Sequence, residues 1–207
     1  MKIRSVEYAG TLVDPKAPFP GDLPQVAFSG RSNVGKSSLI NTLLRRTRRR
    51  IARVSGEPGK TRALNFFRVN DAFFLVDLPG YGYAKVPASM REGWRTLVEG
   101  YLARPDGPAA VVQLIDARHP PQKDDLRMLA YLASAGVPTL VAFTKVDKLK
   151  NTERARRLPA LLEETGLIEE QVIPFSSRTG EGRETLLAAI ESLLQPDPGE
   201  AGDLDEG

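Results

Sequence analysis

The fold is decided by Gly30-Arg31-Ser32-Asn33-Val34-Gly35-Lys36-Ser37, which matches the pattern G-x-x-x-x-G-K-[S/T]. The stretch follows the apolar run Val26-Ala27-Phe28 and precedes a segment of helical period. In a loop of this kind the glycines let the backbone curl, so that successive N–H groups and the positive end of the next helix face phosphate oxygens. We therefore predict a phosphate-binding loop (the P-loop) that ends at Ser38, in which Lys36 reaches the β- and γ-phosphates.

Strand-length apolar runs alternate with helical segments along the chain, which predicts an α/β fold. Strands are expected at Gln25–Ser29, Ala63–Val69, Ala72–Asp77, Ala109–Asp116, Thr139–Thr144 and Gln171–Phe175. Helices are expected at Lys36–Arg45, Ser89–Leu102, Asp124–Ala135, Thr152–Glu164 and Gly182–Leu194. Because only Asn70 and Asp71 separate the second and third strands, these two form a hairpin, and one of them runs antiparallel at the sheet edge. The expected architecture has three layers, with helices flanking a six-stranded, mostly parallel sheet.

Length and composition suit one domain. The chain has 207 residues, of which 41% are hydrophobic and 27% charged. We expect the domain to span 1–195 and the acidic, Pro- and Gly-rich segment 196–207 to be a disordered tail. Cysteine is absent, which excludes disulfides and cysteine-ligated metals. No apolar stretch approaches the roughly 20 residues that a spanning helix needs, and no signal peptide is recognisable. We expect a cytoplasmic protein with no membrane partner.

Oxygen donors near the P-loop predict a Mg²⁺ site, because this ion prefers oxygen ligands and binds beside nucleotide phosphates. Ser37 is the first donor. Asp77 is the second, because it ends an apolar strand at the carboxyl edge of the sheet, where ligands of open α/β folds bind. It opens the stretch Asp77-Leu78-Pro79-Gly80, in which Gly80 is free to bring its N–H to a γ-phosphate.

A second stretch, Thr144-Lys145-Val146-Asp147, follows another apolar strand and predicts a guanine site. The Asp147 carboxylate can accept both N–H groups of the guanine edge, and adenine offers no such pair. Lys145 would lay its stem along the base. Ser176 and Ser177, at the end of the last strand, would donate N–H groups to the guanine carbonyl. The expected ligand is therefore GTP or GDP.

Three stretches resemble the EngB family of translation-factor-related GTPases: Gly30–Ser38, Asp77–Val86 (D-L-P-G-Y-G-Y-A-K-V) and Asp116–Pro121 (D-A-R-H-P-P). The resemblance implies a P-loop GTPase fold and hydrolysis of GTP in a nucleotide-dependent switch that acts in assembly of the large ribosomal subunit. It implies that subunit and its RNA as partners, no DNA, and a monomer off the ribosome. Pro58-Gly59-Lys60-Thr61 also matches the family, which implies that Gly59 and Thr61 contact the nucleotide and that Thr61 binds Mg²⁺ when GTP is present.

Catalysis of phosphoryl transfer rests on positioning and electrostatics, and we assign it to Lys36, Thr61 and Gly80. The glutamine that orients water in many GTPases is absent, since Tyr81 follows Gly80. Intrinsic hydrolysis should therefore be slow and depend on a partner or an ion. Asn33 is expected to help seat K⁺. The side chains of Tyr81 and Tyr83 either pack the loop or contact a partner.

The sequence also leaves other classes of protein open. A septin-like structural protein shares these loops, and a P-loop kinase shares the first of them. Six arginines lie within the nine residues 45–53. Such a run either forms a solvated face or binds RNA phosphates, and its density favours RNA.

Overall fold

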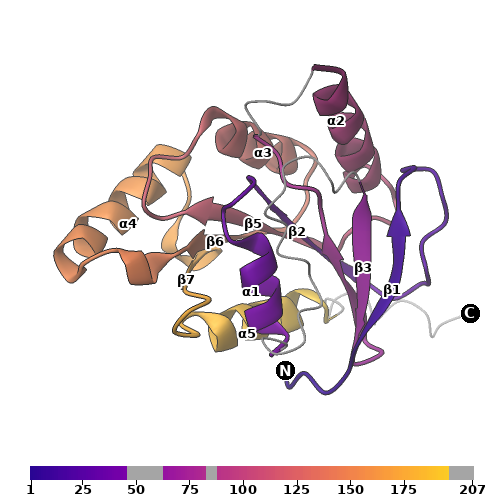
Figure 1. Cartoon of the computed structure of the whole chain (residues 1–207), viewed down its shortest axis with the longest axis horizontal. Helices are drawn as coiled ribbons and strands as arrows, with labels where there is room; N and C mark the ends of the chain where they lie inside the picture. The colour runs from indigo at the N-terminus through magenta and orange to yellow at the C-terminus, as the bar shows by residue number, and fades with distance from the viewer. Residues whose placement is uncertain (46–62, 83–87, 196–207) are drawn as a thin grey trace, which may run out of the picture.

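The computed structural model describes residues 1–45, 63–82 and 88–195, with only the backbone of 88–91. These residues form a seven-stranded sheet in the order β1-β3-β4-β2-β5-β6-β7 (Figure 1). The strands are β1 (Val6–Leu12), β2 (Gln25–Gly30), β3 (Leu64–Val69), β4 (Phe73–Asp77), β5 (Ala110–Asp116), β6 (Thr139–Thr144) and β7 (Val172–Phe175). The helices are α1 (Lys36–Leu43), α2 (Ala88–Leu102), α3 (Lys123–Ser134), α4 (Asn151–Thr165) and α5 (Arg183–Leu193), with short 3-10 turns at Val146–Lys148 and Glu169–Gln171.

The sheet is mostly parallel, as the sequence predicts. Strands β4, β2, β5, β6 and β7 pair in parallel, whereas β3 pairs antiparallel with both β4 and β1. The β3–β4 hairpin closes through Asn70 (φ 54°) and Asp71 (φ 53°), which both adopt the left-handed conformation of a two-residue turn. The predicted α/β class, with a mixed sheet between helices, is confirmed.

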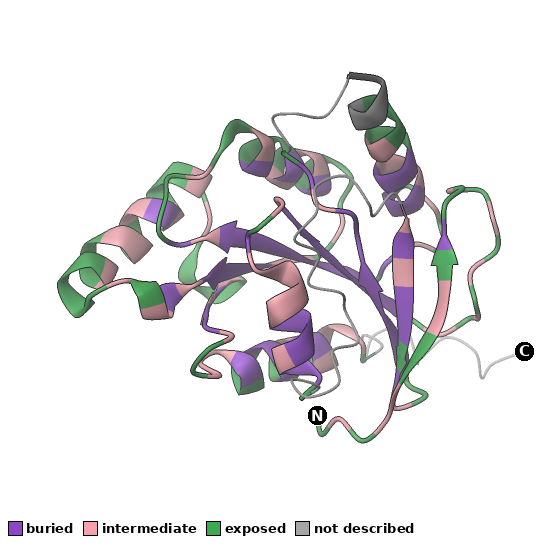
Figure 2. Cartoon of the chain, viewed as in Figure 1, coloured by how far each residue is buried: buried purple, intermediate pink, exposed green. Residues whose placement is uncertain are grey.

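Helices cover both faces of the sheet and divide the core in two. On one face, α1 and α5 pack on side chains such as Val26 and Phe28, which alternate along β2. On the other face, α2 and α3 cover Ala27 and the neighbouring side chains of β3 and β4, and α4 covers the β6 end. The central strands are therefore buried on both sides, as their continuous apolar sequences require (Figure 2).

One strand was missing from the sequence prediction. The six expected strands are present within one residue of their expected bounds, but the sheet has a seventh, β1. It lies outside β3, so the antiparallel strand β3 is not at the edge, and that part of the prediction is wrong. β1 has few buried side chains, because only Leu12 is fully covered and Tyr8 is 59% exposed. Its ladder of hydrogen bonds to β3 holds it, and such a strand carries little hydrophobic signal.

Among the described residues, no helix is both long and apolar enough to cross a membrane.

Candidate nucleotide-binding site

The predicted site residues gather at one edge of the sheet. The parallel strands β2, β4, β5 and β6 end at Gly30, Asp77, Asp116 and Thr144, and β7 ends at Phe175, directly before the two serines of the predicted base site. Carboxyl ends of parallel strands meet at the same edge, where open α/β sheets bind ligands. The fold thus brings together residues that lie more than a hundred positions apart in the chain.

The P-loop joins β2 to α1 in the expected way. Asn33 (φ 67°) and Gly35 (φ 105°) take the left-handed turns that bend the loop, and α1 begins at Lys36. The N-cap residue of α1, Gly35, has no side chain to cap the first turn, and no acidic residue lies in that turn. Its N–H groups and the positive end of its dipole therefore face an anion site. Gly30 is required by space, because a Cβ there would lie 2.9 Å from Val34 Cγ1.

Lys36 and Asp77 meet at the end of this loop. The Lys36 ammonium donates to Asp77 Oδ1, and their side chains are only 10% and 11% exposed. Each charge therefore neutralises the other in a mostly covered position. Ser37 follows Lys36 in the first turn of α1. A cation for phosphate stands beside a carboxylate and a hydroxyl that suit Mg²⁺, so the donor set fits this ion.

The segment that contains Gly80 packs directly on the P-loop. Leu78 N–H donates to Phe28 O over 3.1 Å, and Ser32 N–H donates to Tyr81 O over 2.9 Å. A Cβ on Gly80 would lie 3.0 Å from Ser32 Oγ and 3.2 Å from Ser32 N. A side chain here would force the P-loop to shift by a few tenths of an ångström, so the Gly80 backbone lies closely against the phosphate loop.

The buried Thr144 hydroxyl links the base loop to the P-loop. It donates to Val34 O over 2.7 Å and also lies 3.3 Å from Ile115 O. The threonine hydroxyl thus ties the start of the base loop to the P-loop.

Lys145 crosses the P-loop from the other side. Its ammonium donates to Asn33 O (2.6 Å) and to Asp116 Oδ2 (2.8 Å). Arg118 in turn binds Asp116 through two parallel bonds of 2.9 and 2.8 Å. Burial alone raises the pKa of Asp116, but the bonds from Arg118 and Lys145 outweigh it and lower that pKa to about 2. Asp116 is therefore ionised at neutral pH and holds Lys145 in place.

Asp116 has no role of its own in the sequence prediction, where it only opens the stretch Asp116–Pro121. The available signal was the position of Asp116 at the carboxyl end of a strand. Its pairing with Thr144 across β5 and β6 could not be read from the sequence. Arg118 is exposed but occupied by its bidentate pair with Asp116, and His119 is exposed beside it.

We predict that Asp116→Asn weakens GDP and GTP binding to a similar extent, by about tenfold, because the lysine loses its charged anchor. Titration calorimetry with both nucleotides measures the change. Asp106→Asn is the matched control, since Asp106 pairs in the same bidentate way with Arg104 outside the site. The lowered pKa of Asp116 stabilises the folded state above about pH 4, and this stabilisation is lost as the pH falls towards 2. Equal affinities in wild type and Asp116→Asn would contradict the positioning role.

The two oxygens of the Asp147 carboxylate differ: one accepts a hydrogen bond, and the other lies 4.0 Å from Lys148 Nζ. Ser176 Oγ donates to Asp147 Oδ1 over 2.8 Å, and Ser176 Oγ itself accepts N–H groups from Arg178 and Thr179. Asp147 Oδ2 is buried and has no hydrogen-bond partner among the described residues. A buried acceptor of this kind is costly unless a ligand satisfies it, and the N–H groups of a guanine base are donors of the required kind.

The remaining predicted residues divide into three groups. The loop that carries Ser177 lies beside α1, because Ser177 O accepts a bond from Thr42 Oγ1 over 3.3 Å. Gly59, Thr61 and Tyr83 lie outside the described residues. Tyr81 is 6% exposed, which resolves the open choice for its side chain in favour of packing.

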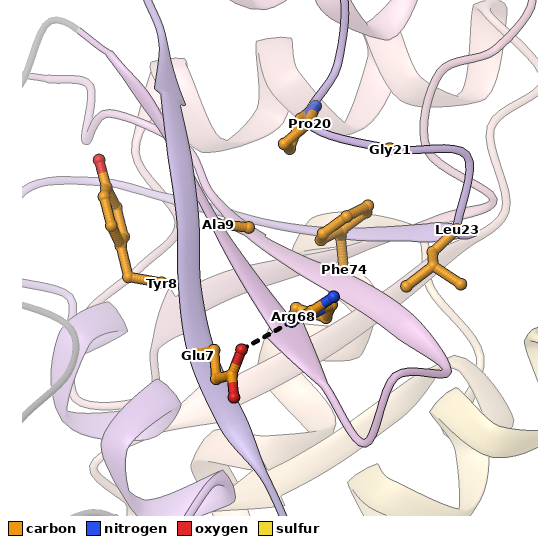
Figure 3. Close-up of a pocket in the computed structure, with 8 residues that line it drawn as sticks. All are labelled: Glu7, Tyr8, Ala9, Pro20, Gly21, Leu23, Arg68 and Phe74. Carbon is orange, nitrogen blue, oxygen red and sulfur yellow. Dashed lines mark hydrogen bonds and ion pairs between the residues drawn. The ribbon is translucent and has the colours of Figure 1, made fainter.

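A hollow of about 350 Å³ lies away from this site, on the β1 side of the sheet (Figure 3). Residues of β1, β3, β4 and the 20–23 loop line it, including Glu7, Arg68 and Phe74. None of the predicted site residues lines it, so it does not enter the assignment of the nucleotide site.

Comparison with known proteins identifies the family. Residues 25–145 match the family model described as 50S ribosome-binding GTPase. A "Probable GTP-binding protein EngB" from Gemmatimonas aurantiaca is 49% identical over 94% of this chain and 95% of its own length. One from Pelotomaculum thermopropionicum is 48% identical over 92% of this chain and 96% of its own length.

Solved structures of similar proteins have the same fold. A crystal structure of a probable GTP-binding protein engB is 25% identical and covers 82% of this chain and 98% of its own, with a TM-score of 0.67. Era from Aquifex aeolicus, solved with GDP and aluminium fluoride, is 22% identical with a TM-score of 0.67 over 84% of this chain and 58% of its own, and supports the fold alone. Taken with the P-loop, the Lys36–Asp77 pair and the buried Asp147 Oδ2, these matches show that the chain belongs to the EngB family of P-loop GTPases.

Proposed function

We propose that this GTPase binds GTP and GDP together with Mg²⁺ and acts as a switch in assembly of the large ribosomal subunit. The observation that carries guanine binding is the buried Asp147 Oδ2, which has no hydrogen-bond partner among the described residues. The description of the matching family, a 50S ribosome-binding GTPase, supports the ribosomal role. The relatives give no support to the septin-like alternative.

Each residue has a distinct task in the proposed mechanism. Lys36 would exchange its bond to Asp77 for the β- and γ-phosphates. Asp77, Ser37 and Thr61 would then hold Mg²⁺, which would supply positive charge against the phosphates. Gly80 N–H contacts the γ-phosphate, and Asp147 with Lys145 fixes the base. The expected donation from Ser176 needs correction, because its N–H already donates to Glu181 O over 3.1 Å. The N–H of Ser177 is expected to face the guanine carbonyl, and Gly59 to contact the nucleotide.

The assembly role is tested by depleting the protein from cells and sedimenting their ribosomes. We expect incomplete large subunits to accumulate, with small subunits unaffected. Wild-type protein should restore the profile and Lys36→Ala should not. A normal large-subunit peak after depletion would overturn the ribosomal part of the proposal and leave the GTPase assignment standing.

Ribosomal RNA is the proposed partner for the arginine run, which lies mostly outside the described residues. The guanidinium group of arginine binds phosphate well. When an arginine–phosphate contact is removed, RNA binding releases fewer counterions and depends less on salt. Replacing Arg48, Arg49 and Arg50 by glutamine should weaken binding to the large subunit and flatten its salt dependence, with GTP affinity as the control. Unchanged association at every salt concentration would mark the run as a solvated face.

Potassium is proposed to stimulate hydrolysis, since Tyr81 replaces the water-orienting glutamine and is buried. Asn33 is exposed in the P-loop, where an amide oxygen can help to seat a monovalent cation. We predict faster turnover in KCl than in NaCl at equal ionic strength, measured by phosphate release. Asn33→Ala should remove the difference. Identical rates in the two salts would exclude a role for the ion.

The other expectations about the protein's setting remain proposals. We propose a cytoplasmic protein that is a monomer off the ribosome and binds neither DNA nor membranes. We also propose that residues 1–195 form its single domain; the tail 196–207 lies outside the described residues.

A further inference from the structure

The Tyr81 side chain lies in a buried polar pocket between β5 and α3. Its hydroxyl donates to Asp125 Oδ1 over 2.9 Å and accepts a bond from Gln113 Nε2. Gln113 is fully buried on β5, and Asp125 is buried in the first turn of α3. Burial is the main cause that raises the pKa of Tyr81 well above 10, and the carboxylate of Asp125 raises it further, so the hydroxyl keeps its proton and donates it.

The backbone of the same residue is bound to the P-loop. Tyr81 O accepts the Ser32 N–H over 2.9 Å, and Tyr81 N–H points at Gly30 O over 3.4 Å. Tyr81 is therefore held at two points, by its side chain and by its backbone. Gly80, immediately before it, cannot shift relative to the P-loop without pulling on the hydroxyl pocket.

Helix α2 is attached to this segment through Trp94. The indole Nε1–H donates to Pro79 O over 2.7 Å, and the indole ring packs against Tyr81 with centroids 5.6 Å apart. Movement of 79–81 therefore changes the surroundings of Trp94. The segment reaches α3 through Asp125 and α2 through Trp94.

This polar pocket fixes the loop at a cost in folding stability. Gln113 Oε1 and Arg31 Nε are both buried without hydrogen-bond partners among the described residues. A buried polar network with unsatisfied members gains less stability than packed apolar groups of the same volume. A purely packing role for Tyr81 would be served better by phenylalanine with an apolar residue in place of Gln113.

We propose that Tyr81 is a positioning residue whose hydroxyl, held by Asp125 and Gln113, keeps Gly80 in register with the P-loop and couples the nucleotide state of this segment to α2 through Trp94. The inference rests on the proposed contact between Gly80 N–H and the γ-phosphate. GDP lacks that phosphate, so loss of the hydroxyl affects the GTP state more than the GDP state.

Trp94 provides the readout, because it is the only tryptophan in the chain. Its emission is recorded for the full chain with GDP and with a non-hydrolysable GTP analogue. We expect different spectra in the wild type and nearly coincident spectra in Tyr81→Phe. We also expect kcat for GTP to fall about fivefold or more in this variant, with the Kd for GDP within about twofold of wild type. Gln113→Met, which removes the second partner of the hydroxyl, should act in the same direction.

Tyr101→Phe is the matched control. Tyr101 is also a buried tyrosine, and its hydroxyl donates to Gln25 Oε1 over 3.0 Å, away from the Gly80 segment. This variant should lose a similar amount of thermal stability and keep the wild-type spectral difference and kcat. A spectral difference in Tyr81→Phe equal to that of wild type, or wild-type spectra that coincide although both nucleotides bind, would overturn the inference and leave the proposed function intact. A wild-type protein that binds neither nucleotide would overturn both.

Discussion

Asp147→Asn is expected to reverse the base preference of the site from guanine to xanthine. In the structure Ser176 holds Asp147 Oδ1, whereas Oδ2 is buried and accepts no hydrogen bond from the described residues. An amide presents an N–H group in its place, which suits the carbonyl of xanthine and leaves a guanine N–H group without an acceptor. Because a site built around buried hydrogen bonds discriminates strongly, the ratio of the GDP and XDP affinities should change by about a thousandfold or more.

Competition binding of GDP and XDP to the wild type and to Asp147→Asn measures that ratio. Ser176→Ala serves as a comparison, because it removes the bond to Oδ1 and leaves the carboxylate. It should weaken both nucleotides without reversing their order. If Asp147→Asn keeps the wild-type preference, the base is recognised elsewhere.

Lys36→Ala is expected to cause the largest loss of GTP affinity and hydrolysis. The lysine is the first residue of α1, at the anion site, and its ammonium donates to the Asp77 carboxylate. Without it, Asp77 remains largely covered with no partner charge, and the phosphates lose a charge-assisted bond. We expect GTP to bind about a hundredfold more weakly or worse, since removal of one partner from such a pair costs about 2–5 kcal/mol.

Fluorescent-nucleotide titration and phosphate release measure the two losses. Lys16→Ala is the control, because Lys16 is exposed in the loop before β2 and away from the P-loop. The unfolding temperature of each variant separates loss of binding from loss of fold. A Lys36→Ala protein that is folded and binds GTP as tightly as wild type would rule out the role given to this lysine.

Local motifs explain why so much of the site could be predicted. The P-loop and the stretches that begin at Asp77 and Thr144 each follow a buried strand, and parallel strands deliver their carboxyl ends to one place. Strong apolar runs predicted the bounds of the inner strands to within one residue. The strand β1 has no such run, because it lies outermost and depends on hydrogen bonds to β3.

Contacts between elements explain what could not be predicted. The bond from Lys145 to Asp116 depends on the register of β5 against β6, which the sequence does not state. The pocket of Tyr81 draws one residue from β5 and another from α3, so neither the packing nor the partner interpretation could be preferred from the loop alone. The role of Thr144 could not be predicted either, because it depends on the position of Val34 O beside the threonine hydroxyl in the folded chain.

The outer strand β1 has a consequence for solubility. Without it, β3 would offer an open edge with the aromatic pair Phe66-Phe67, the kind of strand that recruits other chains and starts aggregation. β1 covers this edge and, in the described part of the chain, becomes the outermost strand itself. It is poorly suited to further pairing, because Glu7 carries a charge and the register is broken between Tyr8 and Gly10. β1 thus contributes little to the core, but it protects the sheet from pairing with the sheets of other copies of the protein.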